Sequence, residues 1–353
     1  MNPRLHDIAI DLLKQLISIP SFSREEDKTA ELLISFFQQQ GITTNRKGNN
    51  IWTVNQNFDI SKPTILLNSH HDTVKPNTGY TRDPFSPIIE DGKLYGLGSN
   101  DAGGPLVSLI VSFLHFHNQR DLKYNIVFVA SAEEEISGTN GIELVWSDLP
   151  KIDFAIVGEP TLTDIAVAEK GLLVLDCVSK GKAGHAAREE GVNAIYEALK
   201  DIEWIRNYRF PKVSPSLGEI KMSVTVINAG QAHNQVPADC KFTVDVRVTD
   251  VYSLEEVLEA IKQNISCSVN ARSLRLRSSG VSPDHPVVKA GLKLGKKLYG
   301  SPTTSDQALI PVSSIKMGPG DSARSHSADE YIYTKEIEDG INSYVSLLAE
   351  LVL

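Results

Sequence analysis

The chain has 353 residues, of which 41% are hydrophobic and 22% are charged. This length and balance are typical of a soluble globular protein with two domains or one large one. The formal net charge of -9 gives no reason to expect a nucleic-acid partner or an anionic membrane surface. Because no run of about 18 apolar residues occurs, we expect no transmembrane helix and no membrane partner.

The first residues of the chain and the spacing of its cysteines indicate the cellular compartment. The first residues, MNPRLHDIAIDLLKQL, place acidic side chains within an apolar pattern of helical spacing and contain no small-residue cleavage site. We therefore expect an amphipathic helix rather than a signal peptide. Cys177, Cys240 and Cys267 are odd in number and widely spaced, which does not fit a disulfide framework. These features favour a cytoplasmic protein.

Two helices are predicted in the first 40 residues. Apolar residues recur at helical spacing until Pro20 stops the first helix. Ser23 followed by Glu26 resembles a capping box that would begin the second helix. Gly41 would end that helix, because glycine readily adopts the left-handed conformation found there.

Three short apolar runs then predict a central sheet. They occupy residues 64–69, 125–130 and 154–158, and they are apolar at consecutive positions, as expected of strands buried on both faces. Helices are predicted between them at residues 104–118 and 138–146. This alternation predicts an α/β fold with a mixed, largely parallel central sheet flanked by helices.

The pattern changes in the middle of the chain. Residues 172–179 and 241–248 alternate in the manner of half-exposed strands, while residues 195–205 and 254–265 have helical spacing. The order strand, helix, two strands, helix, strand predicts a ferredoxin-like α+β unit. The expected domains are residues 1–168 with 279–353, and the inserted residues 169–278.

Polar side chains follow each of the three apolar runs. His70 and Asp72 follow the first run, three glutamates at residues 133–135 follow the second, and Glu159 follows the third. Because open α/β sheets bind ligands at the carboxyl ends of their strands, we expect these side chains to lie together. His70 and Asp72 are two residues apart, so on extended backbone they share a face, and the carboxylate can orient the imidazole.

The glutamates at residues 133–135 would repel one another unless a cation or a shared proton lies between them. A metal removes that cost and leaves one neighbouring carboxylate free to act as a general base. The alternative is an acidic first turn of a helix, which explains one or two of these residues but less easily three.

Two further segments add candidate ligands. Residues 96–104, GLGSNDAGG, lack the lysine of a phosphate loop and the spacing of a dinucleotide fingerprint, which argues against a nucleotide-binding protein. A tight turn that delivers Asp101 is the better interpretation, and a plain turn with a helix-capping Asp is the alternative. His326 lies in SHSADE, where a histidine is usually just exposed. Two histidines with three carboxylates suit a pair of divalent ions of the zinc type. The candidate ligands are His70, Asp101, Glu135, Glu159 and His326.

The ordered motifs HHDTV, GLGSNDAGG, EEISGTNG, GEPT and SHSADE span nearly the whole chain and resemble the dinuclear zinc aminoacylase and exopeptidase family. That family includes acetylornithine deacetylase, succinyl-diaminopimelate desuccinylase, aminoacylase and a glutamate-releasing carboxypeptidase. The resemblance implies that Asp101 bridges two zinc ions, with cobalt as an alternative metal, and that the peptide between Asp101 and Ala102 is cis. The other ligands would be His70 and Glu159 on one ion, and Glu135 and His326 on the second.

Catalytic roles also follow from the resemblance. Asp72 would orient His70, and Glu134 would be the general base that takes a proton from the water at the metals. The family spacing favours Glu134 over Glu133 for this role. Many relatives carry a lysine two residues after the bridging aspartate, where this chain has Gly103. That departure suggests a particular branch, close to the short acetylornithine deacetylase-like enzymes.

Residues 169–278 would be the family's lid and dimerisation domain. His185, in GKAGH, resembles a histidine that reaches the active site of a neighbouring subunit, where it polarises the scissile carbonyl. Without the resemblance, a lid histidine with no such role is the simpler interpretation. Asn234 and Arg247 are implied as contacts to the substrate carboxylate, and Gly318 as part of a loop near the substrate. A homodimer through this domain is therefore expected.

The expected reaction is hydrolysis of an N-acyl group, acetyl or succinyl, from an N-acylated amino acid. N-acetylornithine or an N-acylcitrulline in arginine biosynthesis is the favoured small-molecule partner. Succinyl-diaminopimelate and dipeptides stay open as substrates of the same chemistry. A metal-binding but inactive relative is a further alternative, against which the presence of both Asp72 and Glu134 argues.

Overall fold

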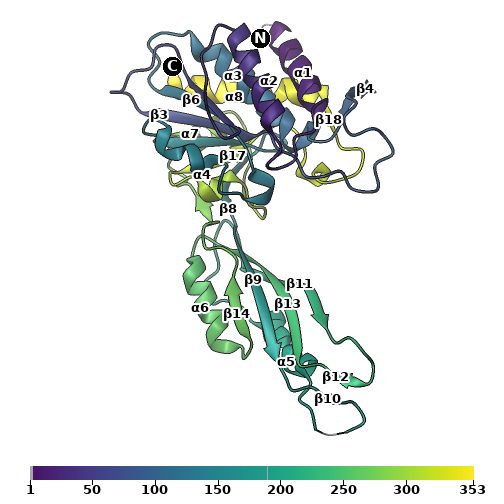
Figure 1. Cartoon of the computed structure of the whole chain (residues 1–353). Helices are drawn as coiled ribbons and strands as arrows, with labels where there is room; N and C mark the ends of the chain where they lie inside the picture. The colour runs from purple at the N-terminus through teal and green to yellow at the C-terminus, as the bar shows by residue number, and fades with distance from the viewer. Residues whose placement is uncertain (1–2, 189) are drawn as a thin grey trace. The chain divides into compact units, whose positions relative to one another are not determined.

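The computed structural model describes residues 3–188 and 190–353 (Figure 1). Backbone contacts divide the chain into two compact units. The first unit comprises Met1–Val167, Gly280–Tyr299 and Ser305–Leu353, and the second comprises Ala168–Ser279 and Gly300–Thr304. Within the described residues, none of the helices combines the length and the apolar content that a membrane-spanning helix requires.

The larger sheet confirms the predicted α/β fold class. Its strands are β1 (Asn45–Lys47), β2 (Asn50–Val54), β3 (Thr64–His70), β6 (Asn125–Ser131), β7 (Phe154–Gly158), β8 (Ile165–Glu169), β15 (Ser279–Gly280), β16 (Leu298–Ser301) and β17 (Ser314–Met317). They lie in the order β1-β2-β6-β3-β7-β17-β8-β15, with β16 beside β8. The middle strands β6, β3, β7 and β17 run parallel, whereas β1, β2 and β8 pair antiparallel with their neighbours.

Both faces of the middle strands are buried, which explains their consecutive apolar residues. Ile65 and Phe128 face a core that they share with the long helices, and Figure 1 shows most of these helices gathered over the sheet. Leu66 and Val127 face the opposite side, where a short helix covers them. The long helices are α1 (Pro3–Ile17), α2 (Asp27–Gln39), α3 (Gly104–His117), α7 (Pro286–Lys293) and α8 (Thr334–Val352), and the short one is α4 (Ile142–Val145).

The predicted capping box at the start of α2 is wrong. The helix begins at Asp27 after an N-cap at Glu26, and no side chain caps it. The Ser23 hydroxyl instead donates a hydrogen bond of 2.7 Å to the carboxylate of Asp72. A hydrogen bond to a charged carboxylate is stronger than one between neutral groups. The Ser23 hydroxyl therefore bonds to Asp72 instead of capping the helix. Gly41 follows the helix with φ +74°, as predicted.

The helix predicted at residues 138–146 is too long. Only Ile142–Val145 forms an α-helix, and Glu134–Ile136 forms a single 3-10 turn before it. The chain between them packs tightly, since a Cβ at Gly138 would lie 1.9 Å from a carboxylate oxygen of Glu133. This loop, rather than a helix, therefore carries the acidic residues.

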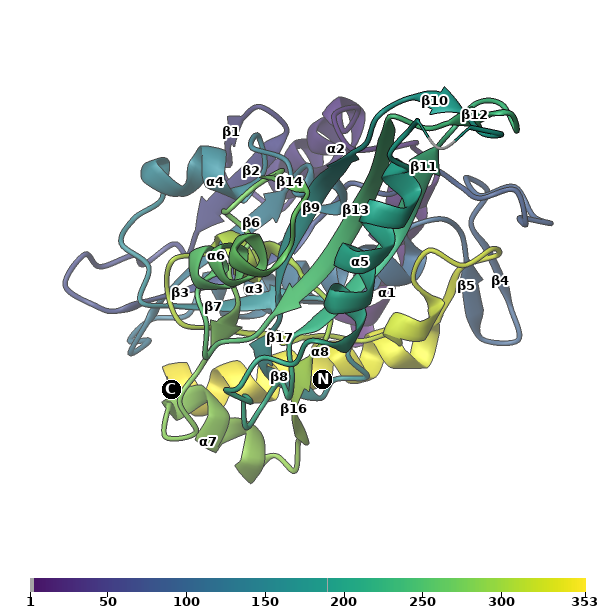
Figure 2. The same ribbon diagram turned by 90° about the horizontal axis from the view of Figure 1, so that it is seen from below.

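The second unit has its own antiparallel sheet. Its elements are β9 (Gly171–Lys180), α5 (Ala194–Asn207), β11 (Lys221–Ala229), β13 (Asp239–Val248), α6 (Leu254–Asn264) and β14 (Ser268–Ala271). The strands lie in the order β11-β13-β9-β14, with every neighbouring pair antiparallel. Figure 2 shows α5 and α6 over this sheet, and their apolar residues form one core with β9 and β13. This is the strand order of a ferredoxin-like unit.

Candidate metal centre

The candidate ligands follow the carboxyl ends of neighbouring parallel strands. His70 is the last residue of β3, Glu135 lies four residues beyond the end of β6, and Glu159 directly follows β7. Since β3 pairs in parallel with both β6 and β7, the three strand ends lie at one edge of the sheet. The geometry expected from the sequence is therefore present for these residues.

One group of possible ligands consists of His70, Asp101 and Glu159, whose ligand atoms lie within 4.8 Å of one another. These three residues form the first group. The Nε2 atom of His70 lies 3.4 Å from Oδ1 of Asp101 and 3.7 Å from Oε1 of Glu159. That nitrogen is buried and makes no hydrogen bond. A buried, unpartnered nitrogen that faces carboxylate oxygens fits the position of a metal ligand.

A second group consists of Asp101, Glu135 and His326. The Nε2 atom of His326 lies 3.0 Å from Oε2 of Glu135 and 3.7 Å from Oδ2 of Asp101. Asp101 belongs to both groups and points one carboxylate oxygen toward each histidine. This is how a carboxylate shared by two ions is arranged.

Asp101 is delivered by an irregular turn before α3. Gly98 adopts φ +74°, and a Cβ there would lie 2.5 Å from the Thr73 side chain, so only glycine fits. The peptide between Asp101 and Ala102 is cis, as the resemblance implied. At Gly103 a Cβ would lie 2.4 Å from the carbonyl oxygen of Gly98. The lysine of many relatives therefore has no room here.

Asp72 bonds both to His70 and to the backbone that follows the neighbouring strand β6. The Nδ1 atom of His70 donates to the backbone carbonyl of Asp72 (2.9 Å), and the nearest carboxylate oxygen of Asp72 is 3.4 Å away. The imidazole is thus oriented by the backbone more directly than by the carboxylate. Because a carbonyl can only accept, the proton of a neutral His70 lies on Nδ1, and Nε2 keeps its lone pair. The carboxylate of Asp72 accepts from the backbone N–H groups of Glu134 (3.1 Å) and Glu135 (3.2 Å).

The structure separates the three consecutive glutamates. Glu133 accepts a hydrogen bond of 2.9 Å from the Asn140 side chain and turns away from the ligand groups. Glu134 points toward them, with Oε2 3.8 Å from Nε2 of His70. Of the two candidates for the general base, only Glu134 has its carboxylate at the ligand groups.

The ionisable groups perturb one another strongly. Burial raises the pKa of the Glu134 carboxyl well above its usual range, although His70 beside it acts in the opposite direction. Burial alone would lower the pKa of His70, but Glu134, Asp101 and Asp72 around it hold that pKa well above its usual value. The hydrogen bond with Glu135 raises the pKa of His326 to about 9. Shifts of this kind cluster at functional sites.

The donor set fits divalent cations. Four carboxylates, those of Asp101, Glu134, Glu135 and Glu159, surround two imidazoles. Carboxylates this close repel one another unless positive charge lies among them. Imidazole nitrogen and carboxylate oxygen, without thiolate, are suitable ligands for zinc-type ions.

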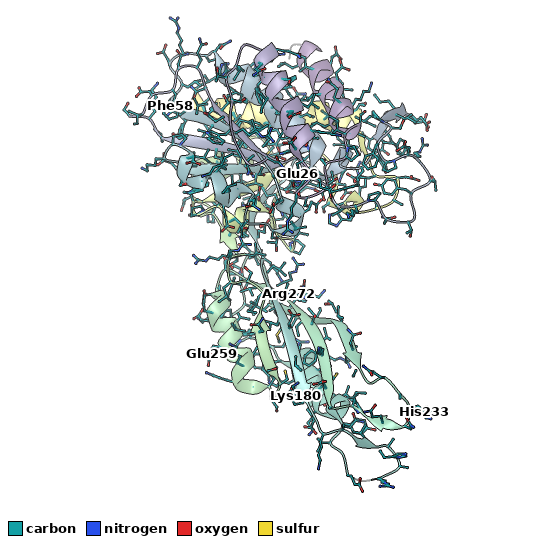
Figure 3. The ribbon with its side chains drawn as sticks, in the orientation of Figure 1. Glu26, Phe58, Lys180, His233, Glu259 and Arg272 are labelled. Atoms are coloured by element: carbon teal, nitrogen blue, oxygen red, sulfur yellow. The ribbon has the colours of Figure 1, made fainter. Side chains whose placement is uncertain are left out.

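Two residues predicted for the lid lie side by side in the second unit. His185 belongs to the short strand β10 (Gly184–His185), which pairs with β12 (Gln235–Val236). The backbone N–H of Ala186 donates to the carbonyl of Asn234 (3.0 Å), so His185 and Asn234 are neighbours at this strand pair. His185 is exposed, and Figure 3 labels His233 in the same loop as Asn234.

Arg247 and Gly318 have different surroundings. Arg247, in β13, makes two hydrogen bonds to Asp245, of 2.9 Å and 3.0 Å, and a third of 3.1 Å to the Thr304 hydroxyl. Its guanidinium is therefore held by Asp245 in this structure. Gly318 follows β17 in the first unit, and a Cβ there would lie 2.5 Å from the carbonyl oxygen of Glu159.

Two residues form hydrogen bonds at the site that the sequence did not predict. Ser23 donates to Asp72, and Glu330 accepts three backbone N–H groups from the turn that carries Asp101. Glu330 is the last residue of the SHSADE motif, which was the only available signal. Spacing alone does not reveal either contact.

Comparison with known proteins gives the family. A family model described as peptidase family M20/M25/M40 matches residues 66–350, a range that contains every residue of both ligand groups. The chain belongs to peptidase family M20/M25/M40. This M20/M25/M40 protein is thus a hydrolase that acts on amide bonds.

Relatives with known names span nearly the whole chain. Acetylornithine deacetylase of Proteus mirabilis is 28% identical over 366 residues, which cover 93% of each chain. A [LysW]-lysine/[LysW]-ornithine hydrolase of Saccharolobus islandicus is 30% identical over 358 residues, covering 97% of this chain and 96% of the relative. These M20/M25/M40 relatives confirm the predicted family.

Solved structures show the same fold. The M20 family metallo-carboxypeptidase Sso-CP2 of Sulfolobus solfataricus has a TM-score of 0.77 at 19% identity and covers 97% of this chain and 98% of its own. The YXEP protein of Bacillus subtilis, described as a dinuclear metal binding peptidase, has a TM-score of 0.74 at 16% identity and covers 99% of this chain and 98% of its own. At these identities the likeness concerns the fold.

Proposed function

We propose that this M20/M25/M40 protein removes the N-acyl group from an N-acylated amino acid, with N-acetylornithine as the first candidate and an N-acylcitrulline as the second. The observation that carries the hydrolytic part is the position of Asp101 between His70 and His326, which forms two ligand groups that share one carboxylate. The acyl and ornithine parts are supported by the names of the relatives, acetylornithine deacetylase and [LysW]-ornithine hydrolase.

The proposed cofactor is a pair of divalent ions, zinc first and cobalt as the alternative. The first group would hold one ion and the second group the other, with Asp101 common to both. When bound, such ions lower the pKa of water and polarise an acyl carbonyl. The unpartnered Nε2 of His70 supports this assignment independently of any relative.

Glu134 is the proposed proton carrier. Its carboxylate takes a proton from the attacking water as the new C–O bond forms, and then gives that proton to the leaving nitrogen as the C–N bond breaks. The products are a free amino acid and a carboxylate. A raised pKa suits this task, since the group must accept a proton and later release it. Asp72 fixes the backbone of Glu134 and so the position of this carboxylate.

His185, Asn234, Arg247 and Gly318 are the proposed contacts to substrate. His185 would stabilise the oxyanion in the site of a second copy of the chain. Asn234 lies beside it where β10 and β12 pair, as two residues that act on one substrate would need. Arg247 would have to exchange Asp245 for the substrate carboxylate, which its planar fork could bind in the same way.

A cytoplasmic homodimer through residues 169–278 is the proposed assembly. Tyr196 and Leu199 on α5 are exposed, and so are Val226 and Ile227 on the neighbouring strand β11. Strand β11 lies at the edge of its sheet, where unpaired backbone groups can join a second copy. Cys177, Cys240 and Cys267 are free thiols, which supports a reducing compartment.

A hydrolysis panel tests the proposal. The protein, loaded with zinc or cobalt, is offered N-acetylornithine, N-acetylcitrulline, N-succinyl-diaminopimelate and a dipeptide, and free amine is measured. We expect acetylornithine to be cleaved fastest, and Glu134→Gln to lose most of this activity. Preference for the citrulline, diaminopimelate or dipeptide compound would reassign the substrate within the family. No release from any compound by the metal-loaded protein would refute the proposed function.

A further inference from the structure

Glu330 is a buried carboxylate beside the proposed metal centre that no step of the reaction uses. It is only 2% exposed and stands immediately before strand β18 (Tyr331–Tyr333), which pairs with β5 (Lys93–Tyr95). A third strand, β4 (Ile88–Glu90), completes this small sheet. The pairing brings Glu330 next to the glycine-rich turn that leads to Asp101, since the backbone N–H of Gly96 donates to the Glu330 carbonyl (3.0 Å).

Both carboxylate oxygens of Glu330 accept hydrogen bonds from that turn. Its Oε1 accepts from the backbone N–H groups of Asn100 (2.8 Å) and Asp101 (2.9 Å), and its Oε2 accepts from that of Gly98 (3.1 Å). Both carboxylate oxygens act as acceptors, so this one side chain takes up three backbone N–H groups of the turn. The backbone of Asp101 is therefore fixed by Glu330 directly.

The same residue also belongs to the segment that carries His326. This segment is anchored by Asp329, which accepts from the backbone N–H groups of Thr81 (2.9 Å) and Arg82 (3.0 Å). His326 itself has a side chain that is 56% exposed and a φ of +58°, so packing does little to hold it. Glu330, four residues further on, is thus one direct connection between the turn of Asp101 and the segment of His326. The Asn100 side chain is another, since it bonds to the backbone of Asp321.

We propose that Glu330 is a positioning residue that sets the distance between Asp101 and His326, and thereby selectively maintains the second ligand group. The inference rests on the proposed metal centre. Asp101 is common to both groups, but the other two ligands of the first group, His70 and Glu159, are placed by β3 and β7, which Glu330 does not touch through any of its described hydrogen bonds. His326, in contrast, lies in the same segment as Glu330. Loss of the Glu330 carboxylate should therefore weaken one ion far more than its neighbour.

Metal titration of Glu330→Gln tests this selectivity. The glutamine keeps the size of the side chain but replaces one acceptor oxygen with an N–H donor, which then faces one of the three backbone donors. Metal-free protein is titrated with zinc, and the number of ions per chain and both dissociation constants are measured. We expect one ion to bind as in the wild type and the second to weaken by about 10- to 100-fold, the usual effect of removing a group that orients a ligand.

Reference variants identify which ion is lost. His326→Ala marks the second group and His70→Ala the first, and Glu330→Gln should match His326→Ala. Combining Glu330→Gln with His326→Ala should weaken the second ion no further, since both changes act on one site. Asp201→Asn is the matched control, because Asp201 is also a buried carboxylate, 4% exposed, that accepts two backbone N–H groups, those of Ser266 and Cys267. It should leave both ions in place.

The possible outcomes separate the inference from the function beneath it. A wild-type chain that binds fewer than two ions would refute the proposed metal centre, and with it this role of Glu330. Two ions in the wild type, with equal losses at both or at neither in Glu330→Gln, would overturn the positioning role alone. Should Glu330→Gln not fold, Glu330→Asp keeps the carboxyl group but is one methylene shorter, and the second ion is again expected to weaken more than the first.

Discussion

The carboxylate of Asp72 accepts a hydrogen bond of 3.1 Å from the backbone N–H of Glu134. The two residues follow neighbouring parallel strands, β3 and β6, so this bond joins two strand ends at the edge where the ligand groups lie. Asp72 also follows His70 by two residues and orients it through its own carbonyl. One residue thus sets the position of the proposed proton carrier relative to a proposed metal ligand.

Asp72→Asn should reduce turnover by about 10- to 100-fold, in line with other groups that orient metal ligands. The amide would turn its own N–H toward a backbone N–H that now donates to Asp72, and the loop of Glu134 would shift. Ser23→Ala should have a smaller effect, because it removes one donor to Asp72 and leaves the charge intact. Steady-state kinetics on both variants checks this order, and turnover of Asp72→Asn equal to the wild type would contradict it.

Glu134→Gln should reduce turnover by about 10²- to 10⁴-fold while the metal content stays unchanged, because a glutamine can neither take up nor release the proton. Glu133→Gln is the matched control one residue away. Its carboxylate bonds to Asn140 instead of facing the ligand groups, so turnover should stay close to that of the wild type. Parallel metal analysis and kinetics decide between them, and the reverse result would move the general base to Glu133.

The ligands at strand ends could be predicted from the sequence because the fold itself brings them together. His70, Glu135 and Glu159 each follow a strand with consecutive apolar residues, and parallel strands present their carboxyl ends at one edge. The position of His326 could not be predicted in this way. It lies 191 residues from Glu135 in the chain, within an exposed loop, and only the family resemblance pointed to it.

Long-range contacts account for the errors. Ser23 has the local pattern of a helix cap, but it bonds to Asp72, which lies 49 residues further along the chain. Glu330 makes its hydrogen bonds to a turn 229 to 232 residues earlier. Local propensity contains no information about such distant partners. The sequence therefore predicted Asp72 and Asp101, but not the hydrogen bonds by which Ser23 and Glu330 hold them.

Metal binding at the second group should weaken as the pH falls. Glu135 raises the pKa of His326 to about 9, so in the metal-free protein His326 carries a proton at neutral pH. An ion needs the lone pair of that nitrogen and must displace the proton. The zinc affinity of the second group should therefore fall by up to about tenfold for each pH unit below about 9. Above that pH, the protonation of His326 should no longer change this affinity.

Zinc titrations at several pH values between about 7.5 and about 9 measure this dependence, in a range where an ordinary histidine has already lost most of its proton. The His326→Ala variant should lose the pH dependence that His326 contributes. A second-site affinity in the wild type that does not change with pH would show that His326 is not a ligand.

The proposed dimer predicts that charge on the exposed apolar surface of the second unit will separate the subunits. Leu199→Asp on α5 and Ile227→Asp on β11 each place a carboxylate among exposed apolar side chains. Burying it at an interface would be costly, so a monomer is expected in sedimentation experiments. Leu292→Asp, at a similarly exposed leucine of α7 in the first unit, is the control and should leave assembly unchanged. A wild-type chain that is already monomeric would refute the dimer.

Gly103 should be required by the shape of its turn, although many relatives carry lysine at this position. A Cβ would lie 2.4 Å from the Gly98 carbonyl oxygen and 2.5 Å from the Leu13 side chain. The carbonyl belongs to the turn that delivers Asp101, so it cannot move away without moving a proposed ligand. Gly103→Ala should therefore destabilise the fold by about 1–3 kcal/mol, the usual cost of overpacking, and Gly103→Lys by at least as much.

Thermal unfolding and metal content of both variants check this requirement. Gly79→Ala is the control, because its Cβ would approach Asn77 and Ala328 only to 3.1 and 3.2 Å, and a smaller loss of stability is expected. If Gly103→Lys instead kept the stability and the metal content of the wild type, the turn would tolerate a side chain. The glycine would then be an incidental difference from the relatives rather than a condition for placing Asp101.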